Sequence, residues 1–201
     1  MSGSGSTWSN SGDLIIGNYK NGYLEINSGG FVAASTLMNI GAGIETDSKG
    51  TVLVTGTDSH LETGSGDITV GNGLSANAVA SLTIAMDGDV RVRTAGDGTV
   101  LVNNYSFLNI GGANGDPAVA SGTLRAASVM LKDEGRLNFN HTGTISGDAH
   151  VFGVEIKGTG FIDHIGPGRT IITSNSGSFS GITTVDTGNF TVNGTLVTCP
   201  H

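Results

Sequence analysis

Residues 6–18 read Ser6-Thr-Trp-Ser-Asn-Ser-Gly-Asp-Leu-Ile-Ile-Gly-Asn18, and residues 59–72 read Ser59-His-Leu-Glu-Thr-Gly-Ser-Gly-Asp-Ile-Thr-Val-Gly-Asn72. The two stretches are versions of one unit, offset by 53 residues at their start and by 54 after a one-residue insertion. Each closes with a short apolar run that ends in Gly-Asn. Self-similarity at a fixed period, built from short strands and glycine turns, is typical of a solenoid in which similar units stack on one another.

Short runs of alternating apolar residues recur along the chain, and each is bounded by Gly, Asn, Asp or Ser. A period of two puts the apolar side chains on one face and predicts short β-strands. The runs occupy residues 14–17, 24–27, 38–41, 52–54, 68–71, 82–84, 90–92, 100–102, 108–111, 137–139, 154–156 and 190–193.

A β-sandwich or barrel also gives short strands at such intervals, but the longer repeat favours a parallel β-helix, that is, a β-solenoid. In this architecture the inward Val, Ile and Leu side chains stack into ladders, and strands pair in parallel from coil to coil. At about 22 residues per coil, about nine coils would form a rod about 40 Å long.

Composition narrows the fold and function classes. The 201 residues include 34 glycines, which argue against a helical protein because each costs about 1 kcal/mol inside a helix. The net charge of −8 argues against a nucleic-acid surface. No apolar run is long enough for a membrane-spanning helix, and the start Met1-Ser-Gly-Ser-Gly-Ser6 does not resemble a signal peptide. Cys199, the single cysteine, has no partner for an intramolecular disulfide.

Two patterns resemble the passenger domains of Gram-negative autotransporters. The first is Trp8-x-Asn10-x-Gly12-x-Leu14-x-Ile16-Gly17, continued by Gly22-x-Leu24-x-Ile26-x-x-Gly29-Gly30-x-Val32, with residues 52–71 as the next copy. The second runs from Gly168 to Leu196 and is similar to the passenger-associated transport repeat, with Ile172 at an aliphatic and Phe179 at the aromatic position.

This resemblance implies a right-handed parallel β-helix. We expect one β-helix segment over residues 1–197, with 168–197 as a transport-like repeat that assists folding and secretion, and a tail over 198–201. Residues 112–135 fit the repeat poorly. The chain would then be a piece of a passenger, and a translocator barrel is expected elsewhere in the parent protein.

Acidic residues mark a possible interaction face. Asp13 and Asp67 hold equivalent positions in the two aligned units, and Asp87 and Asp89 could extend their face. Such a face could serve only solubility and protection against edge-to-edge association. Alternatively it could bind a partner or a second copy through a basic patch; the candidate residues are Arg91, Arg93, Arg125 and Lys132.

Catalytic and cofactor sites are not expected. Asp163-His164 has no accompanying nucleophile motif, and we interpret it as a solvated turn. His141, His150 and His164, with Asp148 and Asp163, could approach one another on successive coils, but their spacing matches no standard zinc pattern. We therefore predict no metal, no cofactor and no enzymatic activity. Trp8 and Phe31 are interpreted as fillers of a coil end or interior.

These observations favour a surface-exposed or secreted passenger segment that acts in adhesion or self-association. Its partners would be host-cell or bacterial surface receptors, or copies of itself, and its location the outside of the bacterial cell. A purely structural stalk or folding segment is the main alternative. A carbohydrate-active β-helix, such as a lyase or tailspike, is disfavoured because aromatic residues make up 5% of the chain and the acidic residues are scattered.

Overall fold

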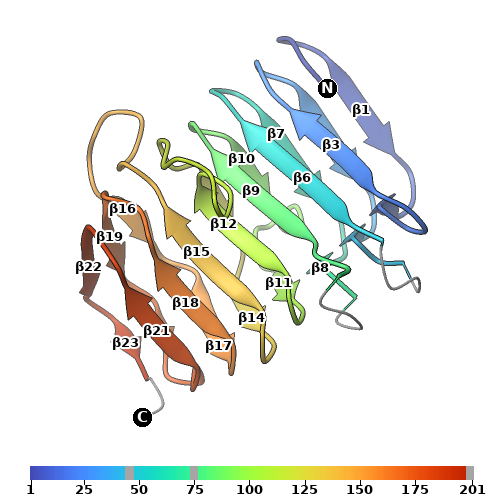
Figure 1. Cartoon of the computed structure of the whole chain (residues 1–201). Helices are drawn as coiled ribbons and strands as arrows, with labels where there is room; N and C mark the ends of the chain where they lie inside the picture. The colour runs from blue at the N-terminus through green and yellow to red at the C-terminus, as the bar shows by residue number, and fades with distance from the viewer. Residues whose placement is uncertain (44–47, 73–76, 198–201) are drawn as a thin grey trace.

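The computed structural model describes residues 1–43, 48–72 and 77–197, so the predicted tail with Cys199 lies outside the described residues. In these ranges the regular elements are strands, and none is a helix. Strands that follow one another along the chain lie on different faces, and each named strand pairs in parallel with strands of neighbouring turns (Figure 1). The predicted β-solenoid is therefore confirmed.

Three sheets form the faces of the solenoid. The first face contains β1 (Thr7–Asn10), β4 (Phe31–Ala34), β7 (His60–Thr63), β10 (Asp89–Arg91) and β13 (Thr123–Arg125). The second face contains β2 (Leu14–Ile16), β5 (Met38–Ile40), β8 (Ile68–Val70), β11 (Thr99–Val102), β14 (Ser128–Leu131) and β17 (Glu155–Gly158). The third face contains β3 (Gly22–Ile26), β6 (Gly50–Thr55), β9 (Ser81–Ala85), β12 (Phe107–Gly111), β15 (Arg136–Asn140), β18 (Phe161–His164) and β21 (Ile182–Val185).

Two smaller sheets complete the C-terminal end. One contains β16 (His150–Phe152), β19 (Arg169–Ile172) and β22 (Asn189–Val192). The other pairs β20 (Asn175–Ser176) with β23 (Thr195–Leu196). Both strands of the second pair belong to the stretch predicted as a transport-like repeat.

The turns are longer than the sequence suggested. Leu24 is aligned with Val52, which lies 28 residues later, and Val52 with Leu82, which lies 30 residues later. On the first face, Trp8 is aligned with Val32 and Val32 with Leu61. The 53-residue repeat therefore spans two turns, and the expectations of about 22 residues per turn and nine coils are wrong, because the corners use more residues than we assumed.

A continuous apolar ladder fills the interior behind the third face. Its fully buried members are aligned from strand to strand: Ile26, Val54, Ile84, Ile110 and Phe139. Burial of each such side chain stabilises the fold by about 1.5–3 kcal/mol. The next position of the ladder is His164, which is also fully buried, so this ladder becomes polar toward its C-terminal end.

Gly17, which closes the first repeated unit, shows why these units end in glycine. Its φ is +76°, and a Cβ there would lie 2.2 Å from the Lys49 carbonyl oxygen of the next turn. Only glycine accommodates both the left-handed backbone and the close contact. The Ile-Gly ending of the sequence motif thus reflects the packing of one corner onto the next.

Candidate binding face

After β12, an eleven-residue corner carries an insertion in place of the tight corners of three or four residues that join the third and first faces in the preceding turns. Residues 27–30, 56–59 and 86–88 form this corner in the preceding turns, whereas residues 112–122 form it after β12. The insertion lies over the outer side of the third face, where Figure 1 shows it as a loop above β12. It falls in the region that fits the sequence repeat poorly, so that misfit indicated a real departure from the solenoid.

Asn140, at the end of β15, holds the insertion in place. Its Nδ2 group donates to the carbonyl oxygens of Ala113 and Asp116, at 3.1 and 2.9 Å. The Gly112 N–H donates in turn to the Asn140 carbonyl oxygen at 2.7 Å. Because Asn140 is buried, these bonds form away from competing water and fix the loop against the sheet.

The far end of the insertion joins the preceding corner. The backbone N–H groups of Met86 and Asp87 donate to the carbonyl oxygens of Ala120 and Ser121, at 2.8 and 3.1 Å. Met86 and Asp87 have φ values of 49° and 70°, a left-handed conformation that costs of order 1 kcal/mol or more per non-glycine residue. The corner and the insertion therefore form one hydrogen-bonded unit that holds the Met86 side chain, 39% exposed, beside the sheet.

A polar ladder lies on the outer side of the third face. Thr83, Asn109 and Asn138 are aligned on β9, β12 and β15 and are buried although they face away from the core. Asn109 Nδ2 donates to Thr83 Oγ1 at 3.1 Å, and Asn138 Nδ2 donates to Asn109 Oδ1 at 3.0 Å. The ladder thus satisfies its own amides and forms a rigid floor at the insertion.

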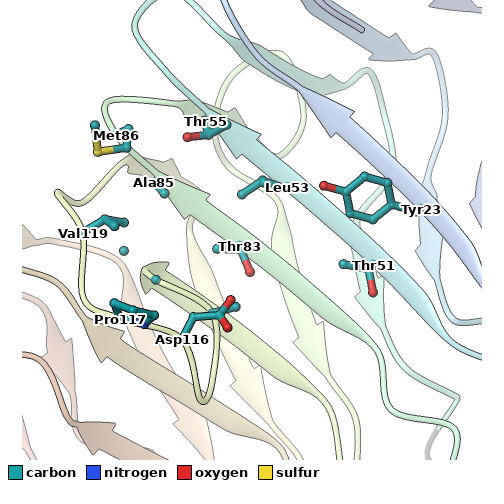
Figure 2. A pocket seen from close by; sticks show the side chains of 13 residues that line it. Tyr23, Thr51, Leu53, Thr55, Thr83, Ala85, Met86, Asp116, Pro117 and Val119 are labelled. Carbon is teal, nitrogen blue, oxygen red and sulfur yellow. The ribbon is translucent and has the colours of Figure 1, made fainter.

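On one side of the insertion lies an apolar hollow of about 450 Å³, shown in Figure 2. Leu53 and Thr83 lie in its floor, Tyr23 stands at one end, and the insertion supplies the opposite wall. The other labelled lining residues are Thr51, Thr55, Ala85, Met86, Asp116, Pro117 and Val119. A hollow of this size and lining can bind an apolar group of a partner.

Tyr23 gives this hollow a polar end. Its side chain is 62% exposed, and its hydroxyl donates to Glu25 Oε2 at 3.2 Å. Partial burial and the neighbouring Glu25 carboxylate raise the pKa of Tyr23 above its usual value. The phenol therefore remains a neutral hydrogen-bonding group at physiological pH.

On the other side of the insertion lies a polar hollow of about 340 Å³. Arg136 Nη1 donates to Asp163 Oδ2 at 2.6 Å, and the guanidinium carbon lies 4.2 Å from the centroid of the Phe161 ring. The hollow is lined by Phe107, Asn114, Arg136, Asn138, Asp163, Ile165 and Asp186. The insertion therefore lies between an apolar and a polar hollow of the third face.

The first face carries a network of charged side chains. Asp89 accepts from His60 Nδ1 at 2.9 Å and from Arg125 Nε at 2.8 Å, and Arg91 Nη1 lies 3.8 Å from Glu62 Oε2. Partial burial raises the pKa of Asp89, but the His60 hydrogen bond and the Arg125 and His60 charges outweigh it, so the pKa is lowered overall. Acids and bases here are aligned on neighbouring turns and neutralise one another.

The four predicted acidic residues occupy two different corners. Asp13 and Asp67 precede β2 and β8, which lie on the same face two turns apart. Asp87 and Asp89 lie at and just after the corner between β9 and β10, beside a hollow of about 390 Å³. The structure therefore places Asp13 and Asp67 at one corner, two turns apart, and Asp87 and Asp89 at another corner.

Three of the four basic residues considered for a complementary patch, Arg91, Arg93 and Arg125, pair with carboxylates of this chain. Arg93 Nη2 lies 3.0 Å from Asp67 Oδ1, and Arg125 pairs with Asp89. The fourth basic residue, Lys132, is exposed just after β14. Among the acidic residues, Asp13 accepts a hydrogen bond from the Thr36 hydroxyl. Exposed pairs of this kind contribute about 0–1 kcal/mol each.

Three side chains differ from their sequence interpretation. Asp163-His164 is part of β18 rather than a solvated turn, with Asp163 facing outward and His164 fully buried. Phe31 is not an interior filler: it faces outward on β4 and stacks on His60, with ring centroids 5.3 Å apart and an interplanar angle of 7°. In each case, strand register decides whether the side chain faces the core or the outside, and the local sequence does not determine that register.

The three histidines considered as metal ligands meet inside the solenoid. The ring centroids of His141 and His150 are 5.3 Å apart, and those of His141 and His164 are 5.8 Å apart. Burial, together with the neighbouring histidines, lowers the pKa of His141 to about 3, and burial lowers that of His150 to about 4. In the described part of the chain, no group of three His, Cys, Asp or Glu residues is arranged to hold a metal ion.

Within the same described ranges, no helix is long and apolar enough to cross a membrane. No known protein-family profile matches the chain, and no solved structure matches it. A curated relative, named "Adhesin BmaC autotransporter" and found in Brucella suis biovar 1 (strain 1330), is 34% identical over 96% of the chain. The chain spans only 5% of that relative's length.

Proposed function

Because the β-solenoid and the similarity to an autotransporter adhesin fit a fragment of a passenger domain, we propose that this chain adheres to other surfaces through its third face. The relative's name, and its similarity over 96% of this chain, support the adhesin-like role. The use of the third face, and the choice of partner, are our proposals.

The insertion over residues 112–122 carries the proposal. The corner it replaces needs only three or four residues in the preceding turns, so the solenoid itself does not require the extra length. The insertion is nevertheless held by paired hydrogen bonds from Asn140 and by backbone bonds to Met86 and Asp87. Ordered loops on a rigid scaffold are where binding residues concentrate.

The arrangement supports a binding role rather than catalysis. Asp163 and His164, adjacent in the chain, point to opposite sides of β18, so they do not form a catalytic pair. On the third face, Arg136 and Asp163 are paired with each other. We therefore propose a non-enzymatic segment that acts at the bacterial cell surface or after secretion.

Partners of this segment would be receptors on host or bacterial surfaces. A solenoid presents its faces repeatedly along one axis, which suits several weak contacts acting together. Self-association is the second form that such contacts could take. A purely structural stalk and a carbohydrate-active β-helix are the alternatives, and deletion of the segment distinguishes them from an adhesive role.

The test deletes the whole 201-residue segment from the parent protein and joins the turns that flank it in register. Loss of host-cell binding, with surface display unchanged, would support the adhesive role. Loss of bacterial clumping alone would instead assign self-association. Unchanged binding and clumping would contradict the proposal and favour a stalk, whereas cleavage of a polysaccharide by the purified segment would favour the enzyme.

A further inference from the structure

We infer that the polar hollow beside the insertion binds a neutral saccharide, with Arg136, Asp163 and Phe107 as its principal contacts. This inference deepens the proposed function and rests on it, because it names the ligand class for one half of the third face. The hollow holds about 340 Å³, at the small end of pockets that hold small ligands and of the right order for a single sugar ring.

The hollow combines planar polar groups with one aromatic ring, that of Phe107. Phe107, Arg136 and Phe161 are aligned in one outward column on β12, β15 and β18. The neighbouring outward column holds Asn138 and Asp163, and Asn114 reaches the hollow from the insertion. A carboxylate, an amide and a guanidinium can each bond two neighbouring hydroxyl groups, while an aromatic ring packs against the apolar face of a sugar.

Arg136 is held ready for such contacts. Its guanidinium lies over Phe161, at 4.2 Å from the ring centroid, and is fixed by the 2.6 Å bond to Asp163. A guanidinium has five N–H donors, and the bond from Nη1 uses one of them. The pair thus presents both donors and acceptors without needing to reorganise when a ligand arrives.

Charge argues for a neutral ligand. Asp163 neutralises Arg136, and Asp186 adds an exposed carboxylate at the rim. An anionic sugar would meet Asp163 and Asp186, and a cationic peptide would meet Arg136 in the same small space. A neutral ligand with many hydroxyl groups avoids both costs and can satisfy every group of the hollow.

The experiment uses the purified 201-residue chain on an array of neutral, sialylated and sulfated glycans, followed by titration of the best ligand. We expect selective binding of neutral glycans. Phe107→Leu removes the ring but keeps an apolar side chain on the outer face, and Arg136→Gln removes the guanidinium. Each should weaken binding about fivefold to tenfold, whereas Tyr19→Leu, an exposed aromatic far from the hollow, should leave it unchanged.

Arg136→Gln could disturb folding because it leaves Asp163 unpaired, so Asp186→Asn and Asn114→Ala provide a second, exposed pair of changes. The matched control is Asp148→Asn, an exposed carboxylate on another loop. The melting temperatures of these exposed variants and of the control should match that of the parent chain. The inference would be overturned if Phe107→Leu and Asn114→Ala left the affinity for neutral glycans unchanged. It would also be overturned if the chain preferred anionic glycans or basic peptides.

The outcome separates the two proposals. Cell binding without binding of neutral glycans would keep the adhesive role and remove the saccharide site. Binding of neutral glycans at this hollow without any cell binding would keep the site and remove the adhesive role.

Discussion

Asn138 donates from Nδ2 to Asn109 Oδ1 at 3.0 Å, across one turn of the solenoid, and both side chains are buried on the outer side of the sheet. Buried amides are stable there only because neighbouring turns satisfy them. The bond ties the floor of the third face together at the point where the insertion crosses it.

Asn138→Ala should therefore lower the free energy of unfolding by about 1–3 kcal/mol, because it leaves the Asn109 amide oxygen without its buried donor. Denaturant titration measures this change. Asn175→Ala, on the exposed side of β20, is the matched control and should change stability by less than about 0.5 kcal/mol. An equal effect of both substitutions would contradict the role of the ladder.

Gly111 and Gly115 test the packing of the insertion against β15. Both have positive φ, of 99° and 87°, but a Cβ on Gly111 would lie 2.2 Å from the Asn140 carbonyl oxygen, whereas one on Gly115 would contact nothing within 4 Å. Gly115→Ala should cost about 1 kcal/mol of backbone strain alone. Gly111→Ala should cost clearly more and displace the insertion, which thermal melting and hydrogen exchange would show.

The buried histidines predict a stability that falls in mild acid. Gly143 N–H donates to His141 Nδ1, and His141 Nε2 lies 2.7 Å from Thr170 Oγ1. His141 is therefore neutral, with its proton on Nε2, and protonation of Nδ1 would break the Gly143 bond. His164 continues the chain from Thr170 to the Thr187 carbonyl oxygen.

Folding lowers the pKa of His141 to about 3 and of His150 to about 4, both below the unfolded value of about 6.5. The unfolded chain then binds more protons below pH 6.5, so stability is complete above this pH and is lost as the pH falls toward the folded values. Between pH 7 and pH 5 the free energy of unfolding should drop by about 3–4 kcal/mol. A flat profile across this range would contradict the buried, neutral state.

His150→Phe should reduce this pH dependence by about half, since one of the two shifted groups is removed. It should also stabilise the protein at pH 7, because His150 Nε2 is buried without a hydrogen-bond partner and the ring lies among Phe139 and Phe152. Tyr19→Phe is a control that should alter neither quantity. Denaturant titrations at pH 7 and pH 5 measure both effects.

The sequence predicted the architecture because alternating apolar runs and the 53-residue repeat depend only on local order. It did not predict the turn length, since the residues used by the corners are settled by packing, as at Gly17 against Lys49. The burial of His164 depends on its alignment with Phe139 in the previous turn, and the local pattern does not reveal this alignment. The two hollows could not be predicted for the same reason: residues 112–135 fit the repeat poorly, but the strands that line the hollows lie far apart in the sequence.

The acidic residues show a similar limit. Asp13 and Asp67, at equivalent positions of the repeat, precede β2 and β8 on one face of the solenoid, and a role for them in binding stays a prediction. The structure adds that Arg93 and Arg125 pair with Asp67 and Asp89 inside the same chain. Each arginine and its acidic partner lie on neighbouring turns and are far apart in the sequence. The sequence alone therefore could not show that these arginines pair within the chain.

Host-cell binding by the Leu53→Lys and Ile15→Lys variants tests adhesion through the third face most directly. Leu53 lies in the floor of the apolar hollow on the third face, and Ile15 is an exposed aliphatic residue on the second face. Both changes add one positive charge to a strand position outside the core. We predict that Leu53→Lys reduces binding of the purified chain about tenfold while Ile15→Lys binds normally. Normal binding by Leu53→Lys, or equal loss in both variants, would contradict adhesion through the third face.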